Sequence, residues 1–441
     1  MATSVANVLN RRKNVQSTIF NAGKELHHRY KAGSKLNFTQ MKTMKCGLSN
    51  ILNLSEEDMQ YSQRSLFSPD TWNKLIRKYN CFNLSLPASI ESFNDKWETI
   101  SDLCIINKDS LLGKKYISTL ESSPAITIYQ LRILDLFREV IYLVDSRRFM
   151  LNQENRAKIS ERDFTYQLWL PIFQKIFHIN DEIIRIKVGE TVLSESTESK
   201  ASIYTSSSNI VGFKVDIRFL LDFETEEFDL ACAEACIPVV PVAKIHHDMS
   251  KLLREGKIMQ TAALNVIQNS SIYSWVIQIS GPSCSFYTVH GTKNQYHVCV
   301  HQFMVVFPKE YSELPSFLKS LSNILMFRDS LEATANSMKA AILKTRSDMD
   351  EGDLGASRPS TPTVFESASI YHTPPHRDSS NSRMPEGIYF DEFTESELGS
   401  SPGSTSHVHD TETDALGFVQ NGEKWTNVLT GKTYSYNPYE L

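Results

Sequence analysis

Hydrophobic side chains follow two spacings along this 441-residue chain, and the change between them marks the expected helices and strands. In the segment 161–177 the apolar positions recur every four residues, at Phe164, Leu168, Ile172 and Ile176. This spacing predicts a helix with one buried face, and Pro171 is expected to kink it. Alternating apolar and polar residues at 183–188 predict a strand after this helix.

The segments that follow predict further strands and helices. Two β-rich runs, 212–223 and 226–237, flank an acidic turn around Thr225 and predict a hairpin. The other expected elements are a Ser/Thr-rich loop at 194–208, a helix at 243–268, strands at 273–280 and 296–307, and a last helix at 311–342. The order helix, three strands, helix, strands, helix is typical of an α/β core, which we place at 161–342.

The chain outside this core divides by composition. Residues 1–45 are basic, with Glu25 as the single acid; a nucleic-acid contact, a nuclear import signal and a solvated mobile arm all remain open for them. Residues 46–160 are expected to be helical. Residues 343–414 are rich in Ser, Thr, Pro, Gly and acids, so they bury too little apolar surface to offset their ordering entropy and are expected to be disordered.

Two features of the C-terminal part point to protein partners. Thr361, Thr373 and Ser401 each precede a proline, which permits phosphorylation by proline-directed kinases and so a controlled partner site. Residues 415–441 regain aromatic side chains around an Asn421-Gly422 turn. A small hairpin and a short partner-binding motif are both open for this last segment.

Composition and charge narrow the class of protein. A net charge of −5 and a pI near 6.2 give no overall basic field, so binding to a phosphate backbone would need a local basic cluster. Seven scattered cysteines without a CxxC pair argue against disulfides and structural zinc, and favour a reducing compartment, nucleus or cytoplasm. The sequence shows neither a signal peptide nor a membrane span, so no membrane association is expected. It also shows no phosphate loop and no HExxH motif, so nucleotide-binding and zinc-protease functions have no direct support.

The predicted hairpin brings two carboxylates together. If its centre lies near Thr225, Asp216 and Glu234 are equidistant from the turn and face each other on neighbouring strands. Alternation directs Lys214, Asp216 and Arg218 to one face, expected to be covered only in part. The residues directed into the core are Val215, Ile217, Phe219 and Leu221.

Two opposed carboxylates suit a hard divalent ion. Asp216 and Glu234 are therefore candidate ligands for Mg²⁺ or Mn²⁺, with water and a phosphate oxygen completing the shell. Such an ion activates a water molecule and stabilises charge on a phosphate, and a lysine nearby can orient that water. The chemistry that this pattern predicts is metal-dependent hydrolysis of a phosphodiester.

The motifs GFKVDIRF, EFDLACAE and SKLLREGK give the chain a resemblance to the PD-(D/E)XK nuclease superfamily, and in particular to a group of uncharacterised fungal proteins placed near it. The resemblance covers residues 161 to about 307 and implies a restriction-endonuclease-like core acting on DNA. Matched position by position, it implies that Asp216 and Glu234 bind the metal. It also makes Glu161 the acid sometimes present on the first helix.

The chain departs from that family at one position. The family's lysine lies two residues after the metal-binding acid, where this chain has Cys236. Lys214, on the same face as Asp216, and Lys251, on the next helix, are the candidate substitutes for it. The candidate catalytic residues are thus Asp216, Glu234, Lys214 and Lys251, and the candidate nucleic-acid contacts are Lys251, Arg254 and Lys257.

A purely structural interpretation stays open beside this one. Asp216 and Arg218 would then form an exposed charged face, Glu234 would pair with Lys214 or Arg254, and the basic residues of the helix would be solvated. His246, His247 and Asp248 are adjacent on a helix and point in different directions, so they are not expected to form a metal cluster. The second function hypothesis is accordingly a degenerate nuclease-like domain that serves as a nucleic-acid or protein binding scaffold.

Overall fold

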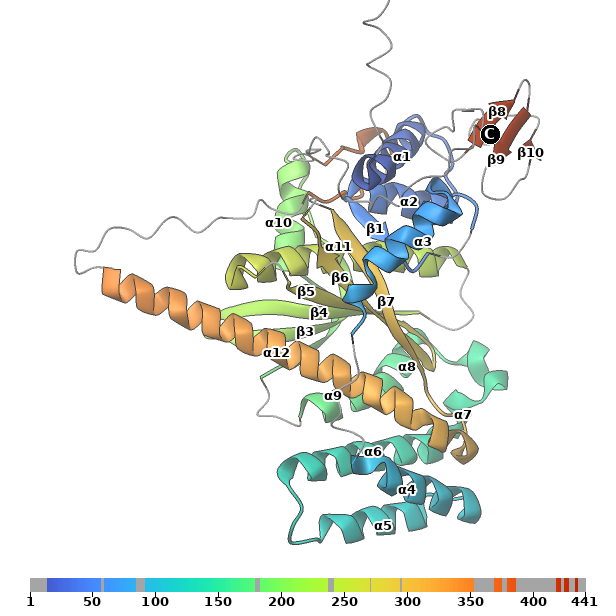
Figure 1. The fold of residues 1–441 in the computed structure, drawn as a ribbon, viewed down its shortest axis with the longest axis vertical. Helices are drawn as coiled ribbons and strands as arrows, with labels where there is room; N and C mark the ends of the chain where they lie inside the picture. The colour runs from blue at the N-terminus through green and yellow to red at the C-terminus, as the bar shows by residue number, and fades with distance from the viewer. Residues whose placement is uncertain are drawn as a thin grey trace, which may run out of the picture.

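A seven-stranded mixed sheet lies at the centre of the protein, with helices on both of its faces (Figure 1). The computed structural model describes residues 14–56, 59–84, 92–178, 183–236, 242–269, 271–293, 296–352, 369–374, 379–385, 418–421, 424–427 and 433–434. The sheet has the order β1-β7-β6-β5-β4-β3-β2. Its strands are β1 (Ile51–Asn53), β2 (Arg185–Val192), β3 (Lys214–Phe223), β4 (Glu226–Cys236), β5 (Tyr273–Ser280), β6 (Ser283–Gly291) and β7 (His297–Val306). The α/β class expected from the sequence is confirmed.

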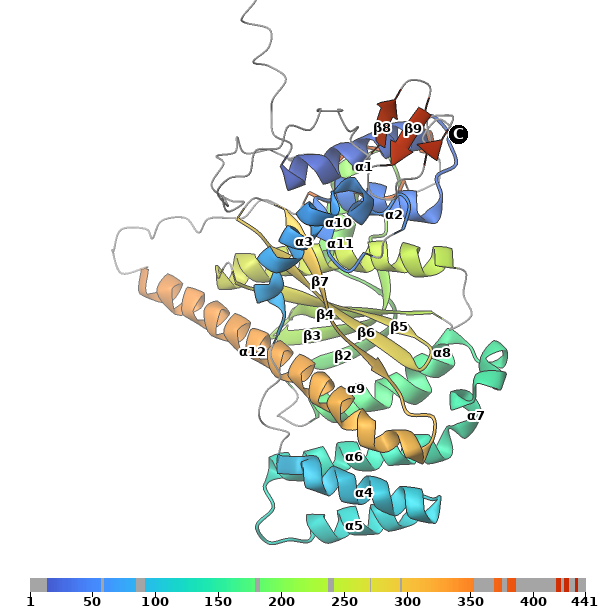
Figure 2. The same ribbon diagram turned by 45° about the vertical axis from the view of Figure 1, so that its right-hand side comes forward.

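Each face of the sheet buries its own apolar core (Figure 2). One face packs against α9 and α12, where the Phe219 ring lies 5.3 Å from that of Phe173 and 5.6 Å from that of Phe327. The other face packs against α11 through Leu252 and Leu253. Burial on both sides explains the long apolar runs in the strands. The helices are α1 (Val15–Lys31), α2 (Phe38–Leu48), α3 (Pro69–Lys78), α4 (Asn94–Asn107), α5 (Leu111–Glu121), α6 (Ile128–Ser146), α7 (Arg148–Leu151), α8 (Glu161–Phe164), α9 (Leu170–Phe177), α10 (Ser194–Ile203), α11 (Val242–Ile267) and α12 (Leu314–Gly352).

The predicted hairpin is formed by β3 and β4. Near the turn Phe223 pairs with Glu226, whereas farther out Ile217 pairs with Ala233, because the register shifts between Phe219 and Leu220. The shift is a β-bulge that adds one residue to β4. Without it, Asp216 would lie opposite Ala233 and Glu234 would point to the other face of the sheet. The bulge therefore sets the face on which the candidate site forms.

Two elements of the core differ from the sequence prediction. The sheet contains a further strand, β6, which leaves β5 through a tight turn at Gly281, where φ is 57°. The expected loop at 194–208 contains α10, although this helix is polar. Its Ser196 hydroxyl accepts a hydrogen bond from the backbone N–H of Phe213 at 2.8 Å. A Cβ on Gly212 would lie 2.4 Å from that hydroxyl oxygen, so glycine allows this close contact.

The N-terminal segment is not a free basic arm where the structure describes it. From Val15 onward it forms α1 and α2, which pack on β1 and α11, and the Lys42 ammonium lies 2.6 Å from the buried Glu56 carboxylate. Residues 1–13 of the expected arm lie outside the described residues. In the described part of 46–160 the chain forms α3 to α7, which agrees with the expected helical character, together with the short strand β1. No helix in the described ranges is long and apolar enough to span a membrane.

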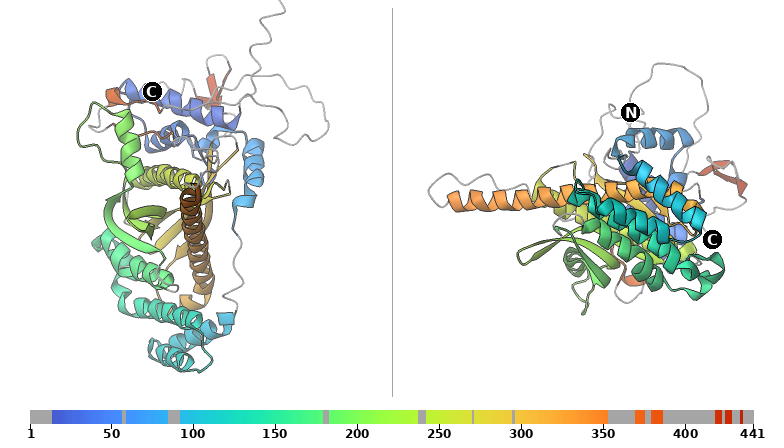
Figure 3. Two further views of the ribbon diagram at one scale, coloured as in Figure 1. Left: turned by 90° about the vertical axis from the view of Figure 1, so that its left-hand side faces the viewer. Right: turned by 90° about the horizontal axis from the view of Figure 1, so that it is seen from below.

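Part of the segment expected to be disordered is packed against the body of the protein. Helix α12 continues to Gly352 and extends past the sheet (Figure 3). Residues 369–374 and 379–385, which we call the C-terminal strap, lie against α1, α10 and α11, and Tyr371 is 1% exposed. The rest of the expected disordered segment, including Thr361, lies outside the described residues. The C-terminal aromatic segment forms an antiparallel hairpin of β8 (Phe418–Asn421) and β9 (Lys424–Asn427), to which β10 (Thr433–Tyr434) adds a third strand.

The strap supplies acceptors to two buried cations of α11. Arg254 donates through Nη1 to the carbonyl of Tyr371 at 2.7 Å, and Lys257 donates through Nζ to the carbonyl of Ser369 at 2.9 Å. The Tyr371 hydroxyl lies 2.8 Å from that of Ser382, which is also hydrogen-bonded to His27. A buried charge without a partner is costly, so the strap is part of the folded core and not an appendage.

The first prediction concerns this strap. Tyr371→Ala should lower the free energy of unfolding by about 3–5 kcal/mol, as for other large aromatic side chains removed from a core. Urea denaturation followed by circular dichroism measures the loss. Tyr142→Ala is the matched control, because Tyr142 is 43% exposed on α6 and should change stability by no more than about 0.5 kcal/mol. Equal stabilities of the two variants would show that the strap does not contribute to the fold.

Candidate functional site

The candidate carboxylates lie at the end of the β3–β4 hairpin distant from its turn. Because Ile217 pairs with Ala233, Asp216 and Glu234 are the next opposed positions. Asp216 is half-buried and its Oδ2 accepts a hydrogen bond from the backbone N–H of Ala235 at 2.8 Å. Glu234 is buried beneath α11. The hairpin therefore brings the two predicted metal ligands to one place.

Of the two candidate lysines, only Lys251 contacts a site carboxylate. Its Nζ lies 2.6 Å from Glu234 Oε1 and donates to the backbone carbonyl of Lys214 at 2.6 Å. The side chain of Lys214 is exposed and pairs instead with Glu190 at 3.2 Å. Lys251 lies on α11, one helical turn before the buried Arg254. The family's lysine, by contrast, lies on the strand that carries the metal-binding acid.

A second lysine, which the sequence did not single out, lies at the same end of the sheet. Lys244 on α11 forms an ion pair with Glu161, and its Nζ is 3.4 Å from the carbonyl oxygen of Ala235. Glu161 is the first residue of α8, whose start is fixed by a capping box between Ser160 and Asp163. A spacing of 83 residues separates Glu161 from Lys244, so no local sequence pattern relates them.

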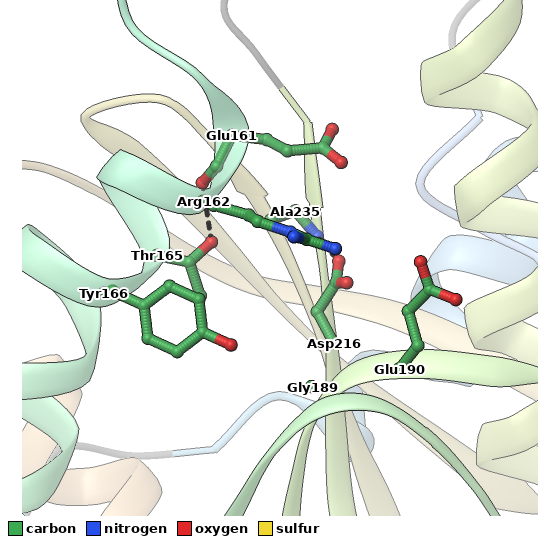
Figure 4. Close-up of a pocket in the computed structure, with 8 residues that line it drawn as sticks. All are labelled: Glu161, Arg162, Thr165, Tyr166, Gly189, Glu190, Asp216 and Ala235. Atoms are coloured by element: carbon green, nitrogen blue, oxygen red, sulfur yellow. Dashed lines mark hydrogen bonds between the residues drawn. The ribbon is translucent and has the colours of Figure 1, made fainter.

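A pocket opens between the α8 segment and the sheet beside Asp216 (Figure 4). It is lined by Glu161, Arg162, Thr165, Tyr166, Gly189, Glu190, Asp216 and Ala235. Asp216 lies at its sheet side, and Glu161 and Arg162 extend over it from the helix. Two of the three predicted metal ligands, Glu161 and Asp216, thus line one pocket, whereas Glu234 lies outside its lining.

Two backbone irregularities shape this pocket. Residues Thr165–Trp169 form a π-helical turn, in which the N–H of Leu170 bonds to the carbonyl of Thr165. This turn lies just before Pro171, which has no N–H to give to a regular helix. On the opposite wall the β2–β3 register shifts between Val188 and Thr191, and Gly189 has φ 98°. Both π-turns and β-bulges are frequent next to functional sites.

Burial dominates the electrostatics of the acids. It raises the pKa of Glu234 to about 8, with a further increase from Asp216 and an opposing effect of Lys251. Burial likewise raises the pKa values of Asp216 and of Asp248, which lies on α11. Asp248 is 4% exposed, and its Oδ2 has no hydrogen-bond partner in the described part of the chain. The site therefore holds more acid than its two lysines neutralise.

Several sequence expectations are corrected here. Arg254 and Lys257 are 1% and 4% exposed and bound to backbone carbonyls, so they cannot contact a nucleic-acid backbone in this fold. The β3 face is not an exposed charged surface, because Arg218 is buried and pairs with Asp229 at 2.6 Å. Glu234 pairs with neither Lys214 nor Arg254, but with Lys251.

Cys236 has no chemical role in the site as it stands. Its thiol is buried and donates to the carbonyl of Ile279 at 3.3 Å, and burial raises its pKa. It supplies neither a cation nor a thiolate. The His246 ring lies against that of Phe38 in a tilted arrangement with centroids 5.0 Å apart, and His247 contacts Lys45 at 3.3 Å.

The oxygen donors can be tested against a divalent ion. Within the described ranges, no three His, Cys, Asp or Glu side chains are arranged as a metal-binding group. Mg²⁺, however, keeps several waters and needs only one or two protein carboxylates. Asp216 and Glu234 lie at opposed positions and match this number of carboxylates. Glu234 pairs with Lys251 and Glu161 pairs with Lys244, so an ion bound by either acid would have to displace an ammonium group.

Comparison of the chain with protein-family models, with curated proteins and with solved structures gives no match. The chemistry of the site has to be argued from its own residues.

The second prediction follows from the burial of Glu234. A carboxyl group whose pKa is raised on folding binds its proton more tightly in the folded state, so its contribution to stability falls as the pH rises from about 4.5 to about 8. Glu234→Gln should remove this loss, giving a flatter dependence of the free energy of unfolding on pH. Urea titrations at pH 5 and pH 8 measure it.

Glu190→Gln is the matched control for that experiment, because Glu190 lies on the same pocket with an exposed side chain. Its pH dependence should equal that of the unmodified protein. If Glu234→Gln behaves like Glu190→Gln, the Glu234 carboxyl does not titrate in the way described.

Proposed function

We propose that this protein is a nuclease-like hydrolase of the PD-(D/E)XK type, which cleaves phosphodiester bonds in DNA at Asp216, Glu234 and Lys251. The observation that carries the proposal is the contact of 2.6 Å between Lys251 Nζ and Glu234 Oε1. It supplies a lysine at the acid pair although Cys236 occupies the family's lysine position. The position on α11 differs from that of the family, but the charge reaches the same carboxylate.

The topology around the site supports the same proposal. Helices α8 and α9 lead into the antiparallel strands β2, β3 and β4, and α11 then connects to β5, which is parallel to β4 and adjacent to it. The resemblance implies this order of helix, three strands, helix and strand. It also implies an Asp on the second strand and an acid on the third, where this chain has Asp216 on β3 and Glu234 on β4.

Each residue has a distinct part in the proposed reaction. Asp216 and Glu234 would hold Mg²⁺ or Mn²⁺, which when bound lowers the pKa of a water and stabilises charge on the phosphate. Asp216 is oriented for this by the N–H of Ala235. The ammonium group of Lys251 opposes the larger effect of burial on the pKa of Glu234, and it places a positive charge beside the position of the phosphate.

The third prediction tests the proposed roles of Asp216 and Lys251, with a variant of Lys214 as the control. Asp216→Asn and Lys251→Met should each reduce Mn²⁺-dependent cleavage of plasmid and single-stranded DNA by about 100-fold or more, as for other groups that stabilise developing charge. Lys214→Met is the matched control: the exposed side chain of Lys214 pairs with Glu190, so cleavage should be retained. Gel assays with Mn²⁺ or EDTA measure the rates, and circular dichroism checks the fold of each variant.

Cleavage that survives Asp216→Asn would exclude this site as its source. Equal loss in Lys251→Met and Lys214→Met would remove the argument that Lys251 replaces the family's lysine, since only Lys251 contacts Glu234.

A second function is favoured by a different observation. Two of the site acids already face ammonium groups of the chain, Glu161 that of Lys244 and Glu234 that of Lys251. A site neutralised in this way suits a degenerate domain that binds nucleic acid or protein without cleaving. A scaffold of this kind predicts no thermal shift with Mg²⁺ or Mn²⁺, whereas metal binding should raise the melting temperature by mass action.

A further inference from the structure

Two exposed side chains stand at the helix wall of the pocket. Arg162 and Tyr166 are four residues apart and both line the pocket beside Asp216 (Figure 4). Tyr166 is 42% exposed, and Arg162 is exposed as well. Arg162 directly follows Glu161, the acid that faces Lys244, and Tyr166 comes five residues after it.

The fold makes no visible use of these two side chains. In the described part of the chain, Arg162 has no side-chain hydrogen bond or ion pair, and Tyr166 has none either. Their neighbour Trp169 shows the contrast, because it is buried and donates through Nε1 to the carbonyl of Gly281 at 2.8 Å. The π-turn thus buries Trp169 while it leaves Tyr166 at the pocket.

We infer that Arg162 and Tyr166 form the substrate-binding edge of this pocket and take single-stranded nucleic acid, with a phosphate on Arg162 and an unpaired base stacked on Tyr166. The inference rests on the proposed function and names its substrate class. A guanidinium presents a planar set of donors to phosphate oxygens, and an exposed phenol ring offers a face to any base. The i, i+4 spacing places both groups on one side of the helical segment.

The preference for a single strand follows from the surfaces around the pocket. A base stacks on a side chain only when its own face is uncovered, which a continuous duplex does not offer. Duplex binding relies on rows of basic contacts to both backbones. The basic residues of α11 that would extend such a row, Arg254 and Lys257, are buried.

The fourth prediction tests this edge by binding, with EDTA present so that no cleavage occurs. Fluorescence anisotropy of labelled oligothymidine and of a matched duplex is measured with the full chain. Tyr166→Leu should weaken binding of the single strand about tenfold, the loss of one stacked base, whereas Tyr166→Trp should restore it. Arg162→Ala should weaken binding of the single strand several-fold, and the dependence of the affinity on salt concentration should fall by about one phosphate contact. Arg162→Lys should recover most of this salt dependence, because it keeps the positive charge.

Matched controls are available on other surfaces. Arg77→Ala on α3 and Tyr142→Leu on α6 remove an exposed arginine and an exposed tyrosine that do not line the pocket, and should leave binding unchanged. Oligouridine, tested alongside, should behave like oligothymidine, because stacking tolerates either sugar.

The outcomes separate this inference from the proposed function. Binding that is absent, that is equal in Tyr166→Leu and Tyr142→Leu, or that is as tight for duplex as for single strand overturns the inference. Cleavage that depends on Asp216 in that case leaves the proposed function intact. Conversely, single-strand binding that requires Arg162 and Tyr166, without any metal-dependent cleavage, supports this edge and removes the hydrolase proposal.

Discussion

The burial of charged side chains on α11 is the constraint on which the rest of the structure depends. This helix packs on the sheet through Leu252 and Leu253, and the same turns carry Lys251, Arg254 and Lys257. Burial lowers the pKa of Lys257 to about 7 and that of Arg254 to about 10, so each cation needs an acceptor beside it. The carboxylate of Glu234 and the carbonyls of the C-terminal strap meet this need at successive turns.

This arrangement connects parts of the chain that are distant in sequence. Lys257 binds carbonyls of Ser49, after α2, and of Ser369 in the strap, while Lys251 binds Glu234 in the sheet. The position of α11 along the sheet is fixed by the strap at Arg254 and Lys257 and by α2 at His246 and His247. The lysines that meet the acids are therefore placed in part by contacts with segments outside the sheet. The site is a property of the whole described core and not of the β3–β4 hairpin alone.

The pocket shows how local departures from regular structure serve a site. A bulge in β4 aligns Glu234 with Asp216, a π-turn before Pro171 leaves Tyr166 outside, and a glycine in the left-handed region displaces β2 at the opposite wall. Each departure costs regular backbone hydrogen bonds, which packing around it has to offset. Their concentration around Asp216 supports the proposal of a functional site there.

The sequence by itself determined the elements whose residues interact locally, which are the helix at 161–177 and the hairpin. Period and turn position carry that information, because side chains two or four residues apart share a face. The pairing of Asp216 with Glu234 was expected from a turn centred at Thr225, but it depends on the bulge in β4, because the turn is centred between Glu224 and Thr225. The tertiary structure decided the rest. Whether Lys214 or Lys251 meets Glu234, whether Arg254 is exposed, and whether Tyr371 is free or buried depend on contacts between distant segments, such as Arg254 with Tyr371, 117 residues apart, and Tyr371 with Ser49, 322 residues apart. Such charge pairs leave no periodic signal in the sequence. A buried charge needs a partner, and the tertiary structure decides which residue lies close enough to be that partner.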